Sequence, residues 1–120
     1  MFRENIKLRA EKRKLSKATD ICRFYSRLQS AYADMLQNDD NITEIRCNYL
    51  LDGFDLGRYT TDFVCKTTSE EYLVRECIDR RLLTKPMTIK LLDASREYWY
   101  KKGIHNWGIV TNKVGNDDCK

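Results

Sequence analysis

Residues 58–81 read RYTTDFVCKTTSEEYLVRECIDRR, and this stretch decides the fold of the chain. Two runs rich in β-branched and aromatic residues flank the polar segment 67–70, a pattern typical of two β-strands joined by a turn. One acid lies inside each run, Asp62 in the first and Glu76 in the second. An acid within a strand is costly unless it reaches water, a metal ion or a hydrogen-bonding partner. We therefore expect any chemical site of this protein to lie at these two strands.

Alternating apolar and polar residues extend the sheet on both sides of this stretch. Residues 43–51 alternate in this way, so that 43–51, 58–66 and 71–79 predict a three-stranded antiparallel meander. Pro86 suits the first turn of a helix over 87–102, and Gly103 is well placed to end that helix. The apolar run 106–112 predicts a last strand, which would be parallel or central because a helical crossover precedes it.

The N-terminal third is predicted to be helical. Residues 1–15 are good helix formers with a thin apolar stripe. Residues 16–37 predict a stronger helix, because apolar side chains recur at helical spacing: Ile21, Tyr25, Leu28, Tyr32 and Met35. The predicted order α-βββ-α-β is an α/β fold with helices flanking a mixed sheet. We divide the chain into a basic N-terminal helical arm (1–15), a single domain (16–112) and a flexible tail (113–120).

The charge of the chain is concentrated at its N-terminus. The 120 residues suffice for one compact domain and carry a formal net charge of +4. Residues 1–17 hold seven Lys/Arg against two Glu, a net charge of +5, so the remainder is nearly neutral. A basic arm suits nucleic acid or another polyanion. The candidate nucleic-acid contacts are Arg9, Lys12, Arg13, Lys14 and Lys17. The alternative is a charged helix end that is merely solvated.

The hydropathy and the cysteine pattern of the sequence argue against a membrane protein, a secreted protein and a zinc-binding protein. No apolar run approaches the ~20 residues that span a bilayer, and no apolar segment follows the basic N-terminus as in a signal peptide. The five cysteines form no CxxC pair, and His105 is the only histidine, which argues against structural zinc. We expect reduced thiols, no membrane partner and a cytoplasmic location.

Four stretches carry a resemblance to a known family. They are SRLQ (26–29), YTTDF (59–63), YLVREC (72–77) and the segment 91–111, which contains YWYKKGI and WGIVT. Together they resemble the N-terminal catalytic domain of the TnsA endonuclease family, in the PD-(D/E)XK nuclease superfamily. TnsA is the endonuclease subunit of certain cut-and-paste transposition systems. The resemblance covers residues 20–112 and implies a restriction-endonuclease-like core.

The resemblance also implies a site for Mg²⁺. Such nucleases hold the metal with acids and place a lysine near the attacking water. The metal and the lysine neutralise the charge that develops on the phosphate. The matching acids here are Asp62 and Glu76, the candidate catalytic and metal-binding residues. The family's helix Glu is matched by Gln29.

The family's strand pair, an acid followed two residues later by a lysine, can be matched in two registers. It aligns with Arg75 and Cys77 or, shifted by one residue, with Glu76 and Ile78. Neither register supplies the lysine, so the catalytic set is incomplete.

The two acids also have structural interpretations. Asp62 could pair with Arg58 or Arg75, and Glu76 with a basic neighbour such as Arg80. Strand alternation sets Glu76 on the face it shares with apolar Val74. We therefore expect Glu76 either to be buried with a partner or to turn into the cavity that holds Asp62.

Three functions agree with these observations. The first is a binding protein, encoded by a mobile element or phage, with a TnsA-like fold and a degraded site. It would act on DNA or a nucleoprotein complex, with a transposase or a CRISPR effector as the protein partner; an anti-CRISPR inhibitor is one form. The second is an active Mg²⁺-dependent DNA endonuclease that uses Asp62 and Glu76. The third is a protein–protein interaction module without nucleic acid. No other cofactor is expected.

Overall fold

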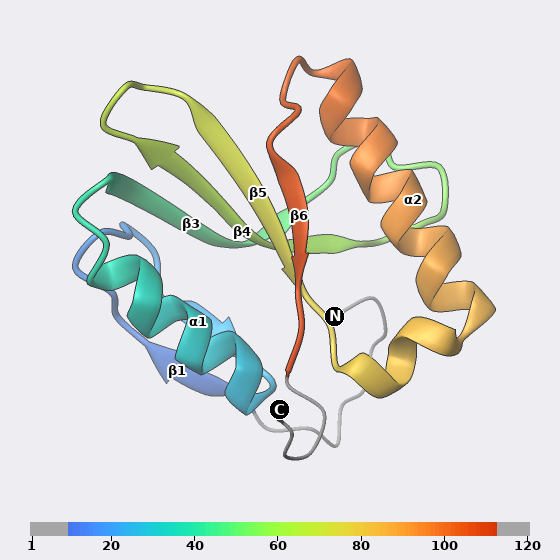
Figure 1. Cartoon of the computed structure of the whole chain (residues 1–120), viewed down its shortest axis with the longest axis horizontal. Helices are drawn as coiled ribbons and strands as arrows, with labels where there is room; N and C mark the ends of the chain where they lie inside the picture. The colour runs from blue at the N-terminus through green and yellow to red at the C-terminus, as the bar shows by residue number, and fades with distance from the viewer. Residues whose placement is uncertain (1–9, 113–120) are drawn as a thin grey trace, which may run out of the picture.

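A four-stranded sheet with one helix on each face forms the centre of the molecule (Figure 1), in a computed structural model that describes residues 10–112. The strands, in spatial order, are β3 (Ile42–Leu50), β4 (Thr60–Thr67), β5 (Tyr72–Cys77) and β6 (Trp107–Val110). β3, β4 and β5 are antiparallel neighbours, and β6 runs parallel to β5 at the edge of the sheet. The α/β class, the meander and the parallel last strand are therefore confirmed.

The second helix begins and ends as predicted. A short 3-10 helix, η1 (Arg80–Thr84), leads into α2 (Pro86–Lys101), whose first residue is the proline. Gly103 has φ +87°, a left-handed conformation that glycine adopts without steric cost. The Ile104 amide then donates to Trp99 O (2.9 Å), which closes the last turn. After this helix end, the chain continues into the sheet as strand β6.

The predicted helices of the N-terminal third are wrong over most of their described length. Residues Glu11–Arg13 form strand β1, which pairs antiparallel with β2 (Cys22–Phe24) in a separate two-stranded sheet. Helix α1 spans only Arg27–Gln37 instead of 16–37. The remainder of the predicted arm and the predicted tail, residues 1–9 and 113–120, lie outside the described part of the chain.

Local chemistry explains the late start of α1. Ser26 has an extended backbone, and its hydroxyl accepts a hydrogen bond from the Gln29 amide (3.2 Å), as an N-cap residue does. The segment before it alternates with period two, since Cys22 and Phe24 are buried while Ile21 is 55% exposed. Met35, the last member of the predicted stripe, is 65% exposed. Leu28 and Tyr32 of the predicted stripe do lie in α1 and pack against the core, whereas the helical spacing of Ile21, Tyr25 and Met35 with them is coincidental.

The two faces of the sheet carry separate cores. On the α1 face, Phe63 packs with Phe24 of β2 and with Tyr32 of α1 at ring-centroid distances of 5.7 and 5.5 Å. On the α2 face, Trp99 packs with Tyr49 at 5.4 Å, and the cluster includes Tyr59, Val74 and Leu91. Leu15 is buried in the α1-side core, so residues next to β1 belong to the packed domain. Neither helix of the described chain is long and apolar enough to cross a membrane.

Candidate functional site

The two acids meet where the pairing of β4 with β5 ends. The ladder runs from Lys66↔Tyr72 to Phe63↔Arg75, and one further step would set Asp62 opposite Glu76. There, hydrogen bonds from backbone amides to carboxylates replace the backbone ladder. The Asp62 amide donates to Glu76 Oε1 (3.3 Å), and the Cys77 amide donates to Asp62 Oδ2 (2.7 Å). Each carboxylate thus binds a backbone amide of the other strand.

Asp62 is held from the α1 side by Gln29. The Gln29 side-chain amide donates to Asp62 Oδ1 (2.9 Å), and both residues are buried. The orientation of this amide is fixed because its oxygen accepts from the Tyr25 backbone amide. The residue that matches the family's helix Glu therefore acts here as a donor to Asp62.

Glu76 is held from the α2 side by two hydroxyls and is fully buried, at 0% exposure. Thr61 Oγ1 (2.9 Å) and Ser95 Oγ (2.7 Å) both donate to Glu76 Oε2. An indole N–H lies behind each hydroxyl: Trp99 Nε1 donates to Thr61 (3.1 Å) and Trp107 Nε1 donates to Ser95 (3.2 Å). Because an indole N–H can only donate, each hydroxyl accepts from its tryptophan and directs its own proton at Glu76.

The sequence interpretation misses these four supporting residues. None of Thr61, Ser95, Trp99 and Trp107 is among the site residues predicted from the sequence. One signal is present, since Ser95 follows Leu91 by four residues and precedes Trp99 by four, which sets a polar residue on the buried stripe of α2. A buried serine on such a stripe needs a polar partner, and Glu76 is that partner.

Burial makes both acids harder to ionise. Desolvation raises the pKa of Asp62 to about 6, against the lowering effect of its bonds from Cys77 and Gln29. Desolvation, and then the negative charge of Asp62, raise the pKa of Glu76 to about 8, while the hydroxyls of Ser95 and Thr61 partly offset this shift. Nearby, the hydroxyl of Tyr59 is buried without a hydrogen-bond partner among the described residues.

The predicted pair between Asp62 and Arg75 is not formed. The donors that bind them are backbone amides, hydroxyls and the Gln29 amide, all neutral. The Arg75 guanidinium donates instead to Asn106 O (3.0 Å) and Asn106 Oδ1 (2.8 Å), between β5 and the start of β6. The acids therefore act as acceptors in a neutral hydrogen-bond network.

Protein donors surround the carboxylates at which the resemblance would place Mg²⁺. All four carboxylate oxygens of Asp62 and Glu76 already accept hydrogen bonds from the protein. A bound Mg²⁺ would need several oxygen ligands, usually including waters, and protein donors already use part of the acceptor capacity of both carboxylates. Across residues 10–112, no three His, Cys, Asp or Glu side chains are grouped as a metal site requires.

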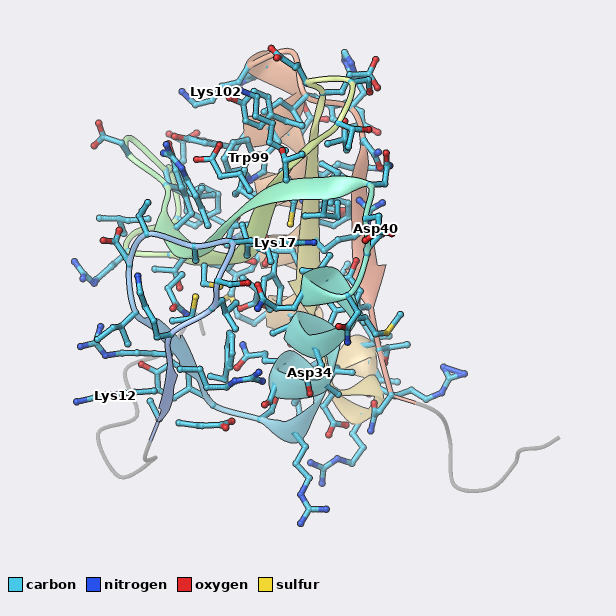
Figure 2. The ribbon with its side chains drawn as sticks, turned by 90° about the vertical axis from the view of Figure 1, so that its left-hand side faces the viewer. Lys12, Lys17, Asp34, Asp40, Trp99 and Lys102 are labelled. Carbon is cyan, nitrogen blue, oxygen red and sulfur yellow. The ribbon has the colours of Figure 1, made fainter. Side chains whose placement is uncertain are left out.

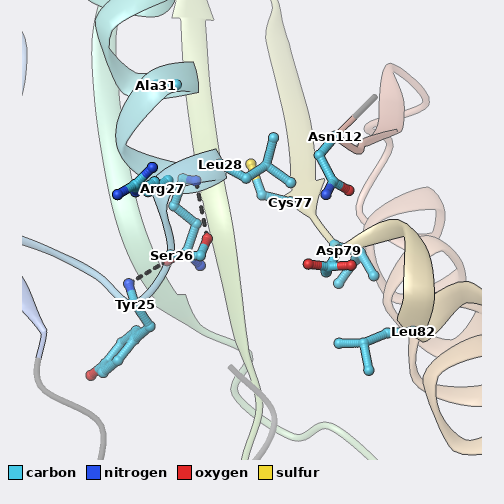
Figure 3. A pocket seen from close by; sticks show the side chains of 11 residues that line it. Tyr25, Ser26, Arg27, Leu28, Ala31, Cys77, Asp79, Leu82 and Asn112 are labelled. Atoms are coloured by element: carbon cyan, nitrogen blue, oxygen red, sulfur yellow. Dashed lines mark hydrogen bonds between the residues drawn. The ribbon is translucent and has the colours of Figure 1, made fainter. Parts of the chain in front are cut away.

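An open pocket lies at the start of α1, and Cys77 and Asp79 line its opposite side (Figure 3). It measures about 480 Å³ and lies between the start of α1 and the segment that follows β5. Gln29 and Cys77, the two residues that donate to Asp62, form part of its lining. Apolar Leu28 and Leu82 and polar Asp79 line it as well. The pocket is thus separated from the Asp62 carboxylate by the donors that hold it.

The basic residues of the predicted arm have mainly intramolecular contacts. Arg13 donates to Ser30 and to Asp34 Oδ1 (2.6 Å), which ties β1 to α1. Lys17 Nζ donates to the carbonyls of Leu36 (3.1 Å) and Asp39 (2.7 Å) at the end of α1.

Lys14 and Lys12, the other two described candidates for nucleic-acid contact, differ in their surroundings. Lys14 Nζ donates to the carbonyls of Ala18 (3.3 Å) and Thr19 (2.9 Å). Lys12 is exposed and points away from the body of the molecule (Figure 2). Arg9 lies outside the described residues.

Comparison with known proteins adds no assignment. No protein-family model matches the chain, and no curated protein matches it. The resemblance to the TnsA family therefore rests on the four sequence stretches described above.

Proposed function

We propose that this protein binds DNA or a nucleoprotein complex, and that its TnsA-like nuclease fold carries an acid pair that is not catalytic. A mobile genetic element or phage is the expected source. Inhibition of a CRISPR effector, or action beside a transposase, are forms that this binding role can take. The observation that carries the proposal is that every carboxylate oxygen of Asp62 and Glu76 accepts a hydrogen bond from a neutral group.

The hydrogen bonds give the acids a structural use. They continue the pairing of β4 with β5 and connect the sheet to α1 through Gln29 and to α2 through Ser95. Removing an acceptor from such a network leaves buried donors unpaired, at about 1–3 kcal/mol each. Neither Cys77 nor Ile78 supplies the ammonium group that the family places beside the metal-bound water. The arrangement therefore favours stabilisation over phosphodiester chemistry.

Charge supports a polyanionic ligand. The chain carries a net charge of +4, and the excess lies in residues 1–17. Cations that contact phosphates release counterions, so binding of this kind weakens as the salt concentration rises. Lys12 and Lys14 are the exposed members of the predicted contact set among the described residues, and Lys14 donates to the carbonyls of Ala18 and Thr19.

A plasmid-nicking assay tests the catalytic half of the proposal. Supercoiled DNA is incubated with Mg²⁺ or Mn²⁺ and the wild-type chain, Asp62→Ala or Asp62→Asn. We expect no metal-dependent nicking and no difference among the three proteins. Cleavage by the wild type that is absent from both variants would instead establish a working nuclease.

Fluorescence anisotropy on a labelled duplex at rising KCl tests the binding half. We expect saturable binding that weakens steeply with salt. An intact chain that does not bind DNA would contradict this half and favour the protein–protein interaction module.

One observation favours the active endonuclease as a second candidate. The pocket of about 480 Å³ reaches Gln29 and Cys77, which are the groups that cover the Asp62 carboxylate. Movement of the Gln29 side chain alone would expose Asp62 Oδ1 to that pocket. The same nicking assay decides between the two candidates.

A further inference from the structure

Two cysteines from different sheets line one pocket. Cys22 lies in β2 and Cys47 in β3, and both are free thiols. Both line a second pocket of about 390 Å³, whose walls come from residues 18–22 and 45–50. Cys22 belongs to the α1-side core, and Cys47 packs against the same core.

Asn48 explains why these cysteines meet. Its side chain pairs with the backbone of β2 on both sides, since Arg23 N donates to Asn48 Oδ1 (2.9 Å) and Asn48 Nδ2 donates to Arg23 O (2.9 Å). Asn48 has φ +56°, a conformation that asparagine tolerates better than most residues. Because residues 23 and 48 are paired, Cys22 and Cys47, which precede them, are set side by side.

The electrostatic surroundings distinguish this pair from the other described cysteines. The hydrogen bond from Cys47, followed by the positive charges of Arg13 and Lys14, lowers the pKa of Cys22, against the effects of burial and of Asp20. Burial raises the pKa of Cys65 to about 12 and also raises that of Cys77. The hydrogen bond with Cys22, and then burial, raise the pKa of Cys47, so thiolate, the reactive form, is favoured at Cys22.

We propose that Cys22 and Cys47 are a site of reversible oxidation, at which a low-molecular-weight disulfide such as glutathione disulfide forms a bond between β2 and β3. A thiolate of the pair attacks one sulphur of the oxidant, which forms a mixed disulfide and releases one thiolate. The second cysteine loses its proton to solvent and attacks the protein sulphur of the mixed disulfide, releasing the second thiolate. The two protein thiols are oxidised by two electrons, and the oxidant is reduced to two thiols.

The bond would connect two parts of the fold that lack a shared backbone ladder. β1 and β2 form their own two-stranded sheet, and the Asn48 side chain joins β2 to β3. A covalent link at the same place would hold the N-terminal hairpin against the main sheet. Oxidation would thus fix the position of the segment that follows the basic N-terminus.

Peptide mapping of the folded wild-type chain tests this proposal directly. Trypsin would place each cysteine in a different peptide: 18–23, 47–58, 59–66, 76–80 and 114–120. The protein is equilibrated with glutathione disulfide, quenched with acid, alkylated and digested. We expect peptide 18–23 linked to 47–58, with the loss of two free thiols per chain, while Cys65 and Cys77 remain alkylated. Reduction with dithiothreitol should restore both thiols.

Matched variants and a denatured sample complete the test. Cys47→Ser should abolish the link and leave Cys22 either free or joined to glutathione, whereas Cys65→Ser should retain the link. Wild type oxidised in urea should give mixed pairings, which shows that the native link depends on the fold. Alkylated Cys22 and Cys47 in the native wild type under excess oxidant, or equal linkage to other cysteines, would overturn the proposal without requiring any variant to fold.

Discussion

Glu76 has three hydrogen-bond donors around it, and all are neutral. Two of them are hydroxyls whose protons are directed at the carboxylate by tryptophan N–H groups. This arrangement favours the ionised form, while complete burial and the neighbouring Asp62 oppose it more strongly and raise the pKa of Glu76 to about 8. Glu76 therefore stabilises the fold through its hydrogen bonds, and this stabilisation depends on the protonation state of its carboxyl group.

Removing the Glu76 side chain should destabilise the protein strongly. Glu76→Ala leaves Thr61 Oγ1, Ser95 Oγ and the Asp62 amide without their acceptor and creates a cavity. We expect the free energy of unfolding to fall by about 2–4 kcal/mol, measured by urea denaturation. Glu97→Ala, at an exposed position of α2, is the control and should change stability by less than about 0.5 kcal/mol. A decrease below about 1 kcal/mol for Glu76→Ala would contradict the anchoring role.

The two raised pKa values predict how stability depends on pH. Asp62 is raised from 3.8 to about 6 and Glu76 from 4.5 to about 8, so the folded protein retains protons that the unfolded chain has already released. The free energy of unfolding should therefore fall as pH rises from 4 to 8, by at most ~1.4 kcal/mol per pH unit for each retained proton. Urea midpoints at pH 5 and pH 8 measure the effect. The double variant Asp62→Asn with Glu76→Gln should show a smaller change, and equal changes in both proteins would rule out this origin.

At the scale of elements, Ser26 determines where α1 begins and hence where Gln29 lies. The Ser26 hydroxyl accepts from the Gln29 amide, and the Gln29 side chain reaches Asp62 from the first turn of the helix. At the other end of α1, Lys17 binds the Leu36 carbonyl, so residues from outside the helix hold both of its ends. The start of this helix is thus part of the network around the acids.

Removal of the N-cap should cost about 1 kcal/mol of stability. Ser26→Ala removes the acceptor of the Gln29 amide, while Ser26→Asp retains an acceptor at the same place. We expect the alanine variant to unfold at lower urea concentration and the aspartate variant to stay close to the wild type. Equal destabilisation by both substitutions would show that the hydroxyl is needed for something other than capping.

At the scale of the whole molecule, the Lys and Arg residues of segment 1–17 form two groups. Arg13, Lys14 and Lys17 bind carbonyls or carboxylates of the domain itself. Lys12 is exposed, and residues 1–9 contain three further Lys/Arg and one Glu. Contacts with a polyanion are therefore expected mainly from the second group.

Deleting residues 1–9 should weaken DNA binding and flatten its salt dependence while leaving β1 in place. The deletion removes Arg3, Lys7 and Arg9, and the salt slope should become shallower by ~0.9 for each of these cations that binds a phosphate. Anisotropy titrations at several KCl concentrations measure both quantities. Lys90→Gln, on an exposed position of α2, removes one charge outside this segment and is the control. Unchanged binding by the shortened chain would show that the DNA-binding surface lies on the body of the domain.

The sequence by itself determined the sheet, α2 and the presence of two acids in neighbouring strands. These features depend on local signals: alternation in β3, β4 and β5, a proline at the start of α2 and Gly103 after its end. Asp62 and Glu76 were predictable as a pair because an antiparallel hairpin fixes which residues are opposite.

Only the tertiary structure decided the N-terminal third and the state of the acids. β1 is a strand because β2 pairs with it, and Ile21–Tyr25 can satisfy either a helical or a strand period until that partner is known. The acids are buried acceptors because Gln29 of α1 and Ser95 of α2 donate to them, while Trp107 of β6 donates to the Ser95 hydroxyl. Those contacts join residues 12–33 positions apart, and no local pattern encodes which distant donor will complete a buried carboxylate.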